Sequence, residues 1–369
     1  MRIDRIELHT IGMPLVRPFE TSFGRQTERE VLLAHVVADG VDGWGECVAG
    51  TTPDYSSEYV AGCAAVIERF LAPALLAAPD VTAAGLDALF AGVIGHRMAK
   101  ATLEAAVLDA ELRAAGTSFG ERLGAVRDRV ECGVSVGISP DLDTLLAEVD
   151  GYVEAGYRRI KLKIKPGWDL EPVARVRELI GTLPLQVDAN TAYTLDHVEH
   201  LRRLDEFGLL LIEQPFVEED IAAHVLLADS IDTPVCLDES ITSTGIAIDA
   251  IERGATSIVN IKPGRVGGYL EAVSIHDACR ALDVPVWCGG MLETGIGRAM
   301  NVALAALPGF ALPGDTSASS RYFAEDLTEP FVLDDGYLSV PTGPGSGVEV
   351  RTDLVERWAI AEPRVLSRS

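Results

Sequence analysis

A chain of 369 residues, 48% of them hydrophobic, is long enough to bury a large core, and it favours two domains or one barrel with additions. The formal net charge of −25 and the isoelectric point of about 4.6 argue against nucleic-acid binding, which needs a basic surface. The sequence has no continuous apolar run of the ~18 residues that a membrane span needs, and residues 1–6 lack the apolar core of a secretory signal, so we expect a cytoplasmic protein.

The first 125 residues have the mixed pattern of a separate α+β domain. Residues 3–11 and 30–37 are typical of strands, and the turn-rich residues 39–43 lead into Trp44-Gly45-Glu46. The alanine-rich stretch 99–115 is helical. The six cysteines form no CxxC pair, and we interpret them as small buried hydrophobic residues rather than disulfides.

From Cys132 onward, short apolar runs alternate with helix-like segments. Ser139 and Pro140 are expected to begin the first helix, and Gly156 to end it. Between them, one apolar stripe contains Leu142, Leu145, Leu146, Val149 and Val153. The strand candidates are residues 132–138, 159–164, 185–190, 209–215, 235–240, 257–263, 284–290 and, more weakly, 310–315.

Eight strands that alternate with helices predict an α/β fold, a (β/α)8-type barrel (a modified TIM barrel) over residues 126–315. An open doubly wound sheet is the competing architecture. It is less favoured because the polar residues follow many successive strands rather than one switch point. Residues 316–369 form a loop-like C-terminal segment with one short strand at 337–340.

Three acidic residues end three successive strand candidates at equal spacing. Asp188, Glu213 and Asp238 are 25 residues apart, which is one β/α unit each time. Their carboxylates should therefore lie on neighbouring strands at the catalytic end of the barrel. A single acid at such a place is more often a helix cap or a surface charge. Three in register predict a divalent cation, and oxygen ligands favour Mg²⁺ or Mn²⁺ over zinc.

Polar residues next to these acids have an expected supporting role. Asn190 and Gln214 follow Asp188 and Glu213 and could hydrogen-bond the metal ligands. Glu239 follows Asp238 and, by strand alternation, should face away from it. We assign Glu239 a structural or supporting role.

Lysines flank the acids on both sides. In KLKIK, Lys161, Lys163 and Lys165 share one face of a strand, so the apolar face would pack on helices and the lysines point into the barrel. A solvated edge strand is the alternative. Lys262 ends the sixth strand candidate, diametrically opposite the second in a ring of eight. Two opposed amines suit proton removal from one face of a substrate and return on the other, and nearby cations would lower their pKa. The alternative for Lys262 is an anion clamp.

With these residues in place, nearly the whole chain resembles the muconate-lactonizing subgroup of the enolase superfamily. Within it, the chain is most similar to the o-succinylbenzoate synthase/N-succinylamino acid racemase (N-acylamino acid racemase) family. A lysine base with Mg²⁺ is an established pattern of that superfamily. The resemblance is carried by MPLVRPFETSFG (residues 13–24), GWGECV (43–48), HRMAKATLEAAVLDAEL (96–112), CGVSVGI, RIKLKIKPGWD, QVDANTAYT, LLLIEQP, CLDES, NIKPGRVGGYLEA, PVWCGGMLETGIGRA and LPGDTSAS.

The resemblance implies a role for each matching position. Residues 1–125 would form a capping domain, and residues 316–369 would pack back toward it. Lys163 would be one acid/base, with Lys161 tuning the field, and Lys262 the other acid/base or a stabilising cation. Asp188, Glu213 and Asp238 would bind Mg²⁺, for which Mn²⁺ or another divalent cation can substitute. Asn190 and Glu239 would support them. The implied substrate contacts are Phe19, Ser22, Phe23, Tyr55, Ser135, Arg265, Gly290 and Met291, of which residues 19–23 form a lid.

Two reactions follow from this resemblance. In the first, a lyase reaction, Lys163 removes a proton from a cyclohexadiene carboxylate, hydroxide leaves, and o-succinylbenzoate forms for menaquinone biosynthesis. In the second, an isomerase reaction, Lys163 and Lys262 exchange the α-proton of an N-succinyl or N-acyl amino acid. Arg265 resembles a feature of racemase-competent members, so we expect both activities in one site.

Dipeptide epimerisation and muconate cycloisomerisation are the nearest alternatives. A metal-dependent barrel hydrolase or aldolase would need histidine ligands, and the seven histidines are not at the ends of the strand candidates. A non-catalytic binding scaffold is the remaining possibility. We expect a small-molecule carboxylate as the partner, no nucleic acid or membrane, and a homo-oligomer.

Overall fold

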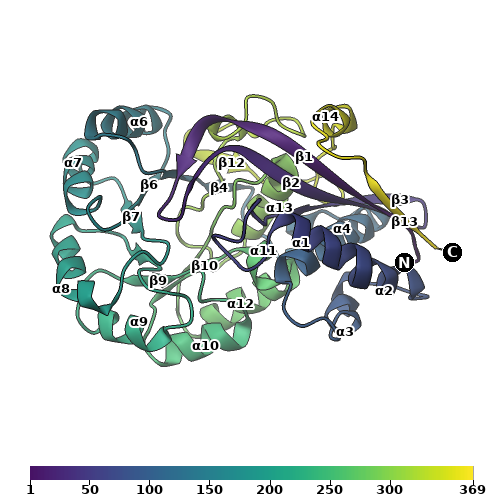
Figure 1. Cartoon of the computed structure of the whole chain (residues 1–369), viewed down its shortest axis with the longest axis horizontal. Helices are drawn as coiled ribbons and strands as arrows, with labels where there is room; N and C mark the ends of the chain where they lie inside the picture. The colour runs from purple at the N-terminus through teal and green to yellow at the C-terminus, as the bar shows by residue number, and fades with distance from the viewer. Residues whose placement is uncertain (369) are drawn as a thin grey trace.

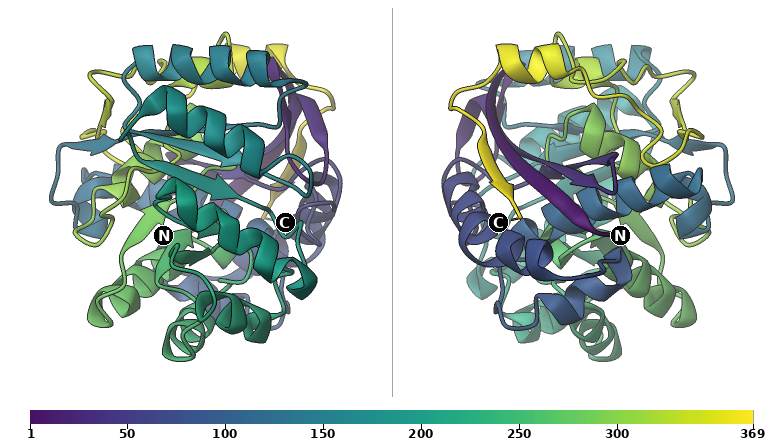
Figure 2. Two further views of the ribbon diagram at one scale, coloured as in Figure 1. Left: turned by 90° about the vertical axis from the view of Figure 1, so that its left-hand side faces the viewer. Right: turned by 90° about the vertical axis from the view of Figure 1, so that its right-hand side faces the viewer.

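The computed structural model describes residues 1–368 and shows an antiparallel sheet beside a curled parallel sheet (Figure 1). The antiparallel sheet has the order β13-β1-β2-β3, and we call it the cap sheet. In the right-hand view of Figure 2, the yellow C-terminal strand lies beside the purple first strand, so the end of the chain completes the sheet that its start begins. The strands of the cap sheet are β1 (Ile3–Glu20), β2 (Arg25–Ala38), β3 (Val41–Cys47) and β13 (Arg364–Ser367).

One long helix, α4 (Arg97–Ala115), packs directly on β3. Gly43 and Gly45 make this contact possible, because a Cβ atom on either would overlap the carbonyl oxygens of Ala106 and Thr102. In the GWGE motif, the two glycines therefore face α4, and the larger residues Trp44 and Glu46 point to the other face of the sheet. The remaining helices of this domain are α1 (Val60–Val66), α2 (Ala72–Ala77), α3 (Leu86–Leu89) and α5 (Phe119–Leu123).

Helices α1 and α2 are joined by a π-helical turn into one stretch, Val60–Ala77. Among residues 1–368, it is the one helix long and apolar enough to cross a membrane by length and composition. Its buried side chains include Cys63, Ile67, Leu71 and Leu75, which recur every four residues and belong to the hydrophobic core. This is the pattern of a helix that buries one face in a folded domain.

The hairpin of β1 and β2 is longer than the sequence predicted. β1 was expected over residues 3–11, but it continues to Glu20. Pro14 and Pro18 concealed this extension, because proline cannot donate to a strand ladder. They are tolerated because β13 pairs only with Arg5–Leu8, which leaves the rest of β1 at the edge of the sheet. The extra length carries the hairpin tip across to the barrel, as Figure 1 shows.

The parallel sheet contains seven strands in the order β5-β6-β7-β8-β9-β10-β11, as expected for consecutive β/α units. Each lies inside a predicted strand but is shorter, because the polar residues at its end already turn away. The strands are β5 (Gly133–Val136), β6 (Arg159–Lys163), β7 (Leu185–Asp188), β8 (Ile212–Glu213), β9 (Val235–Leu237), β10 (Ile258–Ile261) and β11 (Val286–Cys288).

The predicted eighth strand, residues 310–315, is reduced to two isolated parallel bridges. Phe310 bridges to Val286 on β11, and Gly314 bridges to Cys132 just before β5. The segment contains Pro313, which has no N–H to donate to a ladder. The two bridges nevertheless lie between the first and last strands and complete the ring. The α/β barrel with an N-terminal capping domain is therefore confirmed.

The barrel helices lie outside the strands (Figure 2). The predicted start of the first one was wrong by two residues. It begins at Leu142, because the Asp141 carboxylate caps it by accepting a hydrogen bond from the backbone N–H of Thr144 (2.8 Å). The helices are α6 (Leu142–Glu154), α7 (Leu170–Ile180), α8 (Val198–Leu201), α9 (Ile221–Ala228), α10 (Thr244–Glu252), α11 (Pro263–Val266), α12 (Tyr269–Ala281) and α13 (Gly295–Ala305).

The C-terminal segment is mostly irregular. Its predicted strand is β12 (Tyr337–Ser339), which pairs antiparallel with β4 (Arg129–Glu131) ahead of the barrel. One short helix, α14 (Thr352–Arg357), precedes β13. All six cysteines are buried and free, as predicted.

Two buried glutamates of the capping domain join it to the barrel. Glu46 on β3 accepts hydrogen bonds from the backbone N–H groups of Thr294 (3.0 Å) and Gly297 (3.0 Å), at the N-terminus of α13. Glu104 on α4 accepts from the backbone N–H groups of Tyr269 and Leu270 (both 2.9 Å), at the N-terminus of α12. Each carboxylate thus supplies acceptors that the barrel helix lacks, and it lies at the positive end of the helix dipole. Burial raises the pKa of both glutamates to about 7.

Candidate active site

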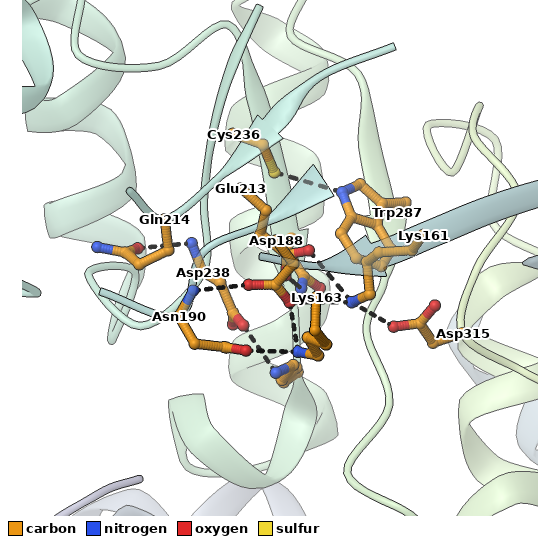
Figure 3. A network of polar contacts seen from close by, with 12 residues as sticks. Lys161, Lys163, Asp188, Asn190, Glu213, Gln214, Cys236, Asp238, Trp287 and Asp315 are labelled. Atoms are coloured by element: carbon orange, nitrogen blue, oxygen red, sulfur yellow. Dashed lines mark hydrogen bonds and ion pairs between the residues drawn. The ribbon is translucent and has the colours of Figure 1, made fainter. Parts of the chain in front are cut away.

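The three predicted metal ligands lie in a row at one end of the barrel (Figure 3). Asp188 ends β7, Glu213 ends β8, and Asp238 follows β9 directly. Asp188 and Glu213 are paired in the strand register, as equal spacing predicted. All three side chains are fully buried. Three buried carboxylates this close require positive charge nearby.

Lysines supply that charge at both ends of the row. Lys163 Nζ lies 2.6 Å from Asp188 Oδ2 and 2.6 Å from Asn190 Oδ1. Lys262 Nζ lies 2.7 Å from Asp238 Oδ2 and 3.1 Å from Tyr55 Oη. The two amines are thus separated by the carboxylate row. Both are buried, which excludes a solvated lysine face.

Lys161 lies behind the row. Its Nζ is 3.3 Å from Asp188 Oδ2, 3.1 Å from Glu213 Oε2 and 2.6 Å from Asp315 Oδ2. It also lies 4.8 Å from the ring centroid of Trp287. Among residues 1–368, Lys161 therefore contacts three carboxylates, whereas Lys163 and Lys262 each contact one.

The donor set fits a hard divalent cation. It consists of carboxylate oxygens alone, the ligands that Mg²⁺ and Mn²⁺ prefer. Asp238 Oδ1 is buried and accepts no hydrogen bond, although Arg265 Nη2 lies 2.8 Å away. Burial and the charge of Asp188 raise the pKa of Glu213, the central carboxylate. Within the described residues, the carboxylate oxygens of Asp188, Glu213 and Asp238 are not all within 4.8 Å of one another. The ammonium groups of the three lysines lie against these carboxylates.

Direct contact with carboxylates raises the pKa of two of the three lysines. Burial disfavours the charged form of Lys161, but Asp315, Glu213 and Asp188 outweigh burial, so the pKa of Lys161 is raised. Burial also disfavours the charged form of Lys262, but the charge of Asp238 outweighs burial, so the pKa of Lys262 is raised as well. The expected lowering of the lysine pKa depends on a cation held by the carboxylates, and it stays a prediction.

Two family matches cover most of the chain. Residues 5–124 match the mandelate racemase/muconate lactonizing enzyme N-terminal domain, and residues 144–354 match the enolase C-terminal domain-like family. The chain belongs to the enolase superfamily. The first match ends just after α5, and the second begins within α6 and runs into α14.

Relatives of this enolase-superfamily enzyme match over nearly its whole length. It is 60% identical to an N-succinylamino acid racemase from Amycolatopsis sp, over 98% of this chain and 99% of the relative. It is 47% identical to an o-succinylbenzoate synthase from Geobacillus kaustophilus, over 97% and 96%. Its structure resembles that of an enolase-superfamily member from Listeria innocua with a TM-score of 0.95, at 36% identity and 100% coverage of both chains.

A cavity of about 320 Å³ lies between the barrel end and the hairpin tip. The hairpin is fixed there by hydrogen bonds from the backbone N–H of Ile138 to Glu20 O (2.8 Å) and from Ser22 Oγ to Asn190 O (3.0 Å). Lys161, Lys163 and Lys262 reach the cavity. The predicted substrate contacts that line it are Phe19, Phe23, Tyr55, Ser135, Gly290 and Met291.

Two predicted substrate contacts of this superfamily member lie elsewhere. Ser22 faces the backbone of Asn190 and is not among the cavity-lining residues. Arg265 is buried behind Asp238, where it also donates to the carbonyl oxygens of Ile241 and Asn260. The prediction placed Arg265 in the substrate pocket, whereas the structure gives it a role in holding a metal-ligand candidate.

Glu239 is the supporting residue whose orientation differs from the prediction. Glu239 does not face away, because β9 ends at Leu237 and strand alternation no longer applies. Its Oε1 accepts from Asn190 Nδ2 (2.9 Å), so it acts on Lys163 through Asn190. Gln214 Oε1 accepts from the backbone N–H of Asp238 (2.9 Å), not from a side chain. Asn190 and Gln214 have φ angles of 40° and 38°, a region that non-glycine residues rarely adopt outside functional sites.

Sequence reasoning missed two residues of the network. Asp315 bridges Lys161 and Arg159, at 2.6 and 2.8 Å. Asn260 Nδ2 donates to Glu213 Oε1 (2.7 Å). The position of each residue in the sequence could have indicated its role. Asp315 ends the weak eighth strand candidate, and Asn260 precedes Lys262 by two residues, which places the two side chains on the same face of a strand.

Proposed function

We propose that this enzyme removes the proton next to a substrate carboxylate in a metal-dependent reaction, and that it acts as an N-succinylamino acid racemase and an o-succinylbenzoate synthase. The observation that carries the proposal is the placement of Lys163 and Lys262 at opposite ends of a buried carboxylate row, both facing one cavity. A substrate carbon between two amines can lose a proton to one and gain it from the other. The relatives named above support the substrate class.

Asp188, Glu213 and Asp238 would hold the cation, Mg²⁺ or another divalent metal. When bound, it would supply positive charge that stabilises the negative charge developing on the substrate carboxylate. Arg265 and Asn260 keep two of these carboxylates oriented, since they contact Asp238 Oδ1 and Glu213 Oε1. Gln214 fixes the backbone that carries Asp238.

The chain's own groups carry the proton. As a neutral amine, Lys163 would accept the α-proton at Nζ and become an ammonium, which Asp188 and Asn190 would stabilise by accepting its hydrogen bonds. Lys262 would donate from the other side in racemisation, with its Nζ held by Tyr55 Oη. In the dehydration, Lys163 alone is needed as base. Lys161 is tied to three carboxylates and would add positive charge without transferring a proton.

The capping domain would exclude water from the reaction. Phe19 and Phe23 of the hairpin and Tyr55 of the following loop line the cavity opposite the barrel residues. Phe23 and Tyr55 also pack together, with ring centroids 5.6 Å apart. Excluding water strengthens the charge interactions that the reaction depends on.

Self-association and a cytoplasmic location remain predictions.

The two activities are tested together with the Mg²⁺-loaded protein. N-succinylphenylalanine in D₂O is expected to lose its α-proton signal by NMR and its optical rotation, and the cyclohexadiene carboxylate precursor is expected to yield o-succinylbenzoate. Exchange without dehydration would restrict the proposal to the racemase. Absence of both would contradict the assigned substrates.

Arg25 is expected to recognise the distal carboxylate of the succinyl group. It lies at the start of β2, lines the cavity, and has no ion-pair partner among residues 1–368. We expect Arg25→Gln to raise KM for N-succinylphenylalanine by about 10-fold, the effect of losing a partly exposed charge-assisted hydrogen bond. KM for N-acetylphenylalanine should change less than 2-fold or so.

The matched control is Arg69→Gln, because Arg69 is an exposed arginine of the capping domain outside the cavity. It should leave both KM values unchanged. Equal increases for the succinyl and acetyl substrates in the Arg25 variant would show that Arg25 does not recognise the distal carboxylate.

A further inference from the structure

A second group of possible metal ligands lies on the cap sheet, on the two strands whose hairpin tip covers the cavity. Glu7 and His9 are on β1, and His35 on β2 is the register partner of Glu7. Their side chains are 20%, 16% and 13% exposed. His35 stacks on Trp44 with ring centroids 4.3 Å apart. Gly43 and Gly45 face α4, so Trp44 and this group occupy the opposite face of the sheet.

Three ligand atoms converge in this group. Glu7 Oε2 lies 3.3 Å from His9 Nε2 and 3.3 Å from His35 Nδ1. All three atoms lie within 4.8 Å of one another. A tetrahedral metal with bonds of about 2.0–2.1 Å separates its ligand atoms by about 3.3 Å. The two distances therefore match the edges of a coordination tetrahedron better than the ~2.7–2.9 Å expected of a charge-assisted hydrogen bond.

The hydrogen bonding around the group leaves nitrogen lone pairs without donors. His35 Nε2 is 2.6 Å from Asp42 Oδ1, so in a neutral ring this nitrogen carries the proton. Nδ1 then faces the carboxylate of Glu7 with a lone pair. His9 Nε2 is buried and makes no hydrogen bond. The lone pairs of two imidazole nitrogens and one carboxylate oxygen thus face one point. They repel one another unless a cation or added protons lie between them.

The remaining charges leave Glu7 Oε2 free for a metal. Arg5 Nε lies 2.9 Å from the other oxygen, Oε1. Arg5 therefore leaves Oε2 to the two imidazole rings, which lie 3.3 Å from it.

We propose that Glu7, His9 and His35 form a binding site for a divalent transition metal of the zinc class. Two imidazole nitrogens and one carboxylate oxygen are a ligand set that suits Zn²⁺, Co²⁺ or Ni²⁺ rather than Mg²⁺. Asp42 orients His35 through its second nitrogen, as carboxylates commonly do for metal-bound histidines. The metal would join β1 to β2 and would leave a fourth position open. The site is independent of the proposed reaction.

Cobalt is the probe that separates this site from the barrel site. Co²⁺ is titrated into the full-length protein in excess Mg²⁺, and visible absorption is recorded. A four-coordinate site with histidine ligands gives strong bands, whereas an oxygen-only octahedral site gives weak ones. We expect one equivalent of Co²⁺ to produce strong bands that one equivalent of Zn²⁺ abolishes. Glu213→Gln, in the barrel, should give the same titration.

Variants locate the bands. His9→Gln and His35→Gln should each weaken Co²⁺ binding at least 100-fold, and Asp42→Asn by about 10- to 100-fold. His96→Asn is the matched control, because His96 is exposed, lies outside the group, and has a φ of 49° that asparagine tolerates. Far-UV circular dichroism verifies that each variant is folded. No strong bands, or bands that persist in both His9→Gln and His35→Gln, would overturn the proposal.

Discussion

Replacing Lys163 with alanine will lower the rate of racemisation and of dehydration by about 10²- to 10⁴-fold, the usual contribution of a positioned acid or base. Lys163 Nζ is the amine that Asp188 and Asn190 hold at one end of the carboxylate row, and in the described part of the chain it is the one amine that contacts that Asn190 oxygen. The measurement is α-proton exchange by NMR in D₂O for each enantiomer of N-succinylphenylalanine, together with the dehydration rate.

Lys262→Ala provides the comparison that assigns the two faces. It should abolish racemisation, while the enantiomer whose α-proton faces Lys163 still exchanges with solvent. The matched control is Lys165→Ala, because Lys165 follows β6, is 39% exposed and pairs with Glu20 at 3.5 Å. Lys165→Ala should retain both rates within about 2-fold. If Lys163→Ala retains racemisation, the assignment of Lys163 as a base is wrong.

Removal of divalent cations with EDTA will abolish both activities, and Mg²⁺ or Mn²⁺ will restore them. The reason is the charge excess of the carboxylate row, which makes it a strong site for a cation, and the charge that the reaction develops on the substrate. Asp238→Asn should reduce kcat by about 10²- to 10³-fold at saturating Mg²⁺, comparable to loss of one group that stabilises a developing anion. It should also raise the Mg²⁺ concentration needed for half-maximal activity.

Asp249→Asn is the control for the charge change. Asp249 lies on α10, is 60% exposed and pairs with Arg253. Neither its kcat nor its Mg²⁺ requirement should change. Full activity of the wild-type enzyme after exhaustive chelation would contradict a metal-dependent reaction. Restoration by Mg²⁺ alone would also show that the group of Glu7, His9 and His35 is dispensable for the chemistry.

The arrangement of the site could be predicted where the strand repeat controls it. Equal spacing placed Asp188 and Glu213 in register, and alternation turned Lys161 and Lys163 inward. The prediction failed where the strand ends, because the backbone there turns. Glu239 is the clearest example, since it follows the last residue of β9 by two positions and bonds Asn190. Arg265 is another, because it lies on the short helix α11 after β10 and turns behind Asp238.

Contacts between residues far apart in the chain were the other feature that could not be predicted from the sequence. The hairpin tip is close to the barrel only because β1 and β2 are long, and two prolines concealed that length. The partnership of Asp315 with Lys161 joins residues far apart in the chain, across the closure of the ring. Neither local propensity nor hydrophobic periodicity carries such information.

The glutamates at the helix N-termini limit how this enzyme can be recombined. A chimera that joined this barrel to a foreign cap would leave the first N–H groups of α12 and α13 buried without Glu104 and Glu46. An exchange of domains would therefore have to move Glu104 together with α12, and Glu46 together with α13. New substrate specificities are more accessible through changes in the hairpin tip and the Tyr55 loop, which alter the cavity and leave that junction intact.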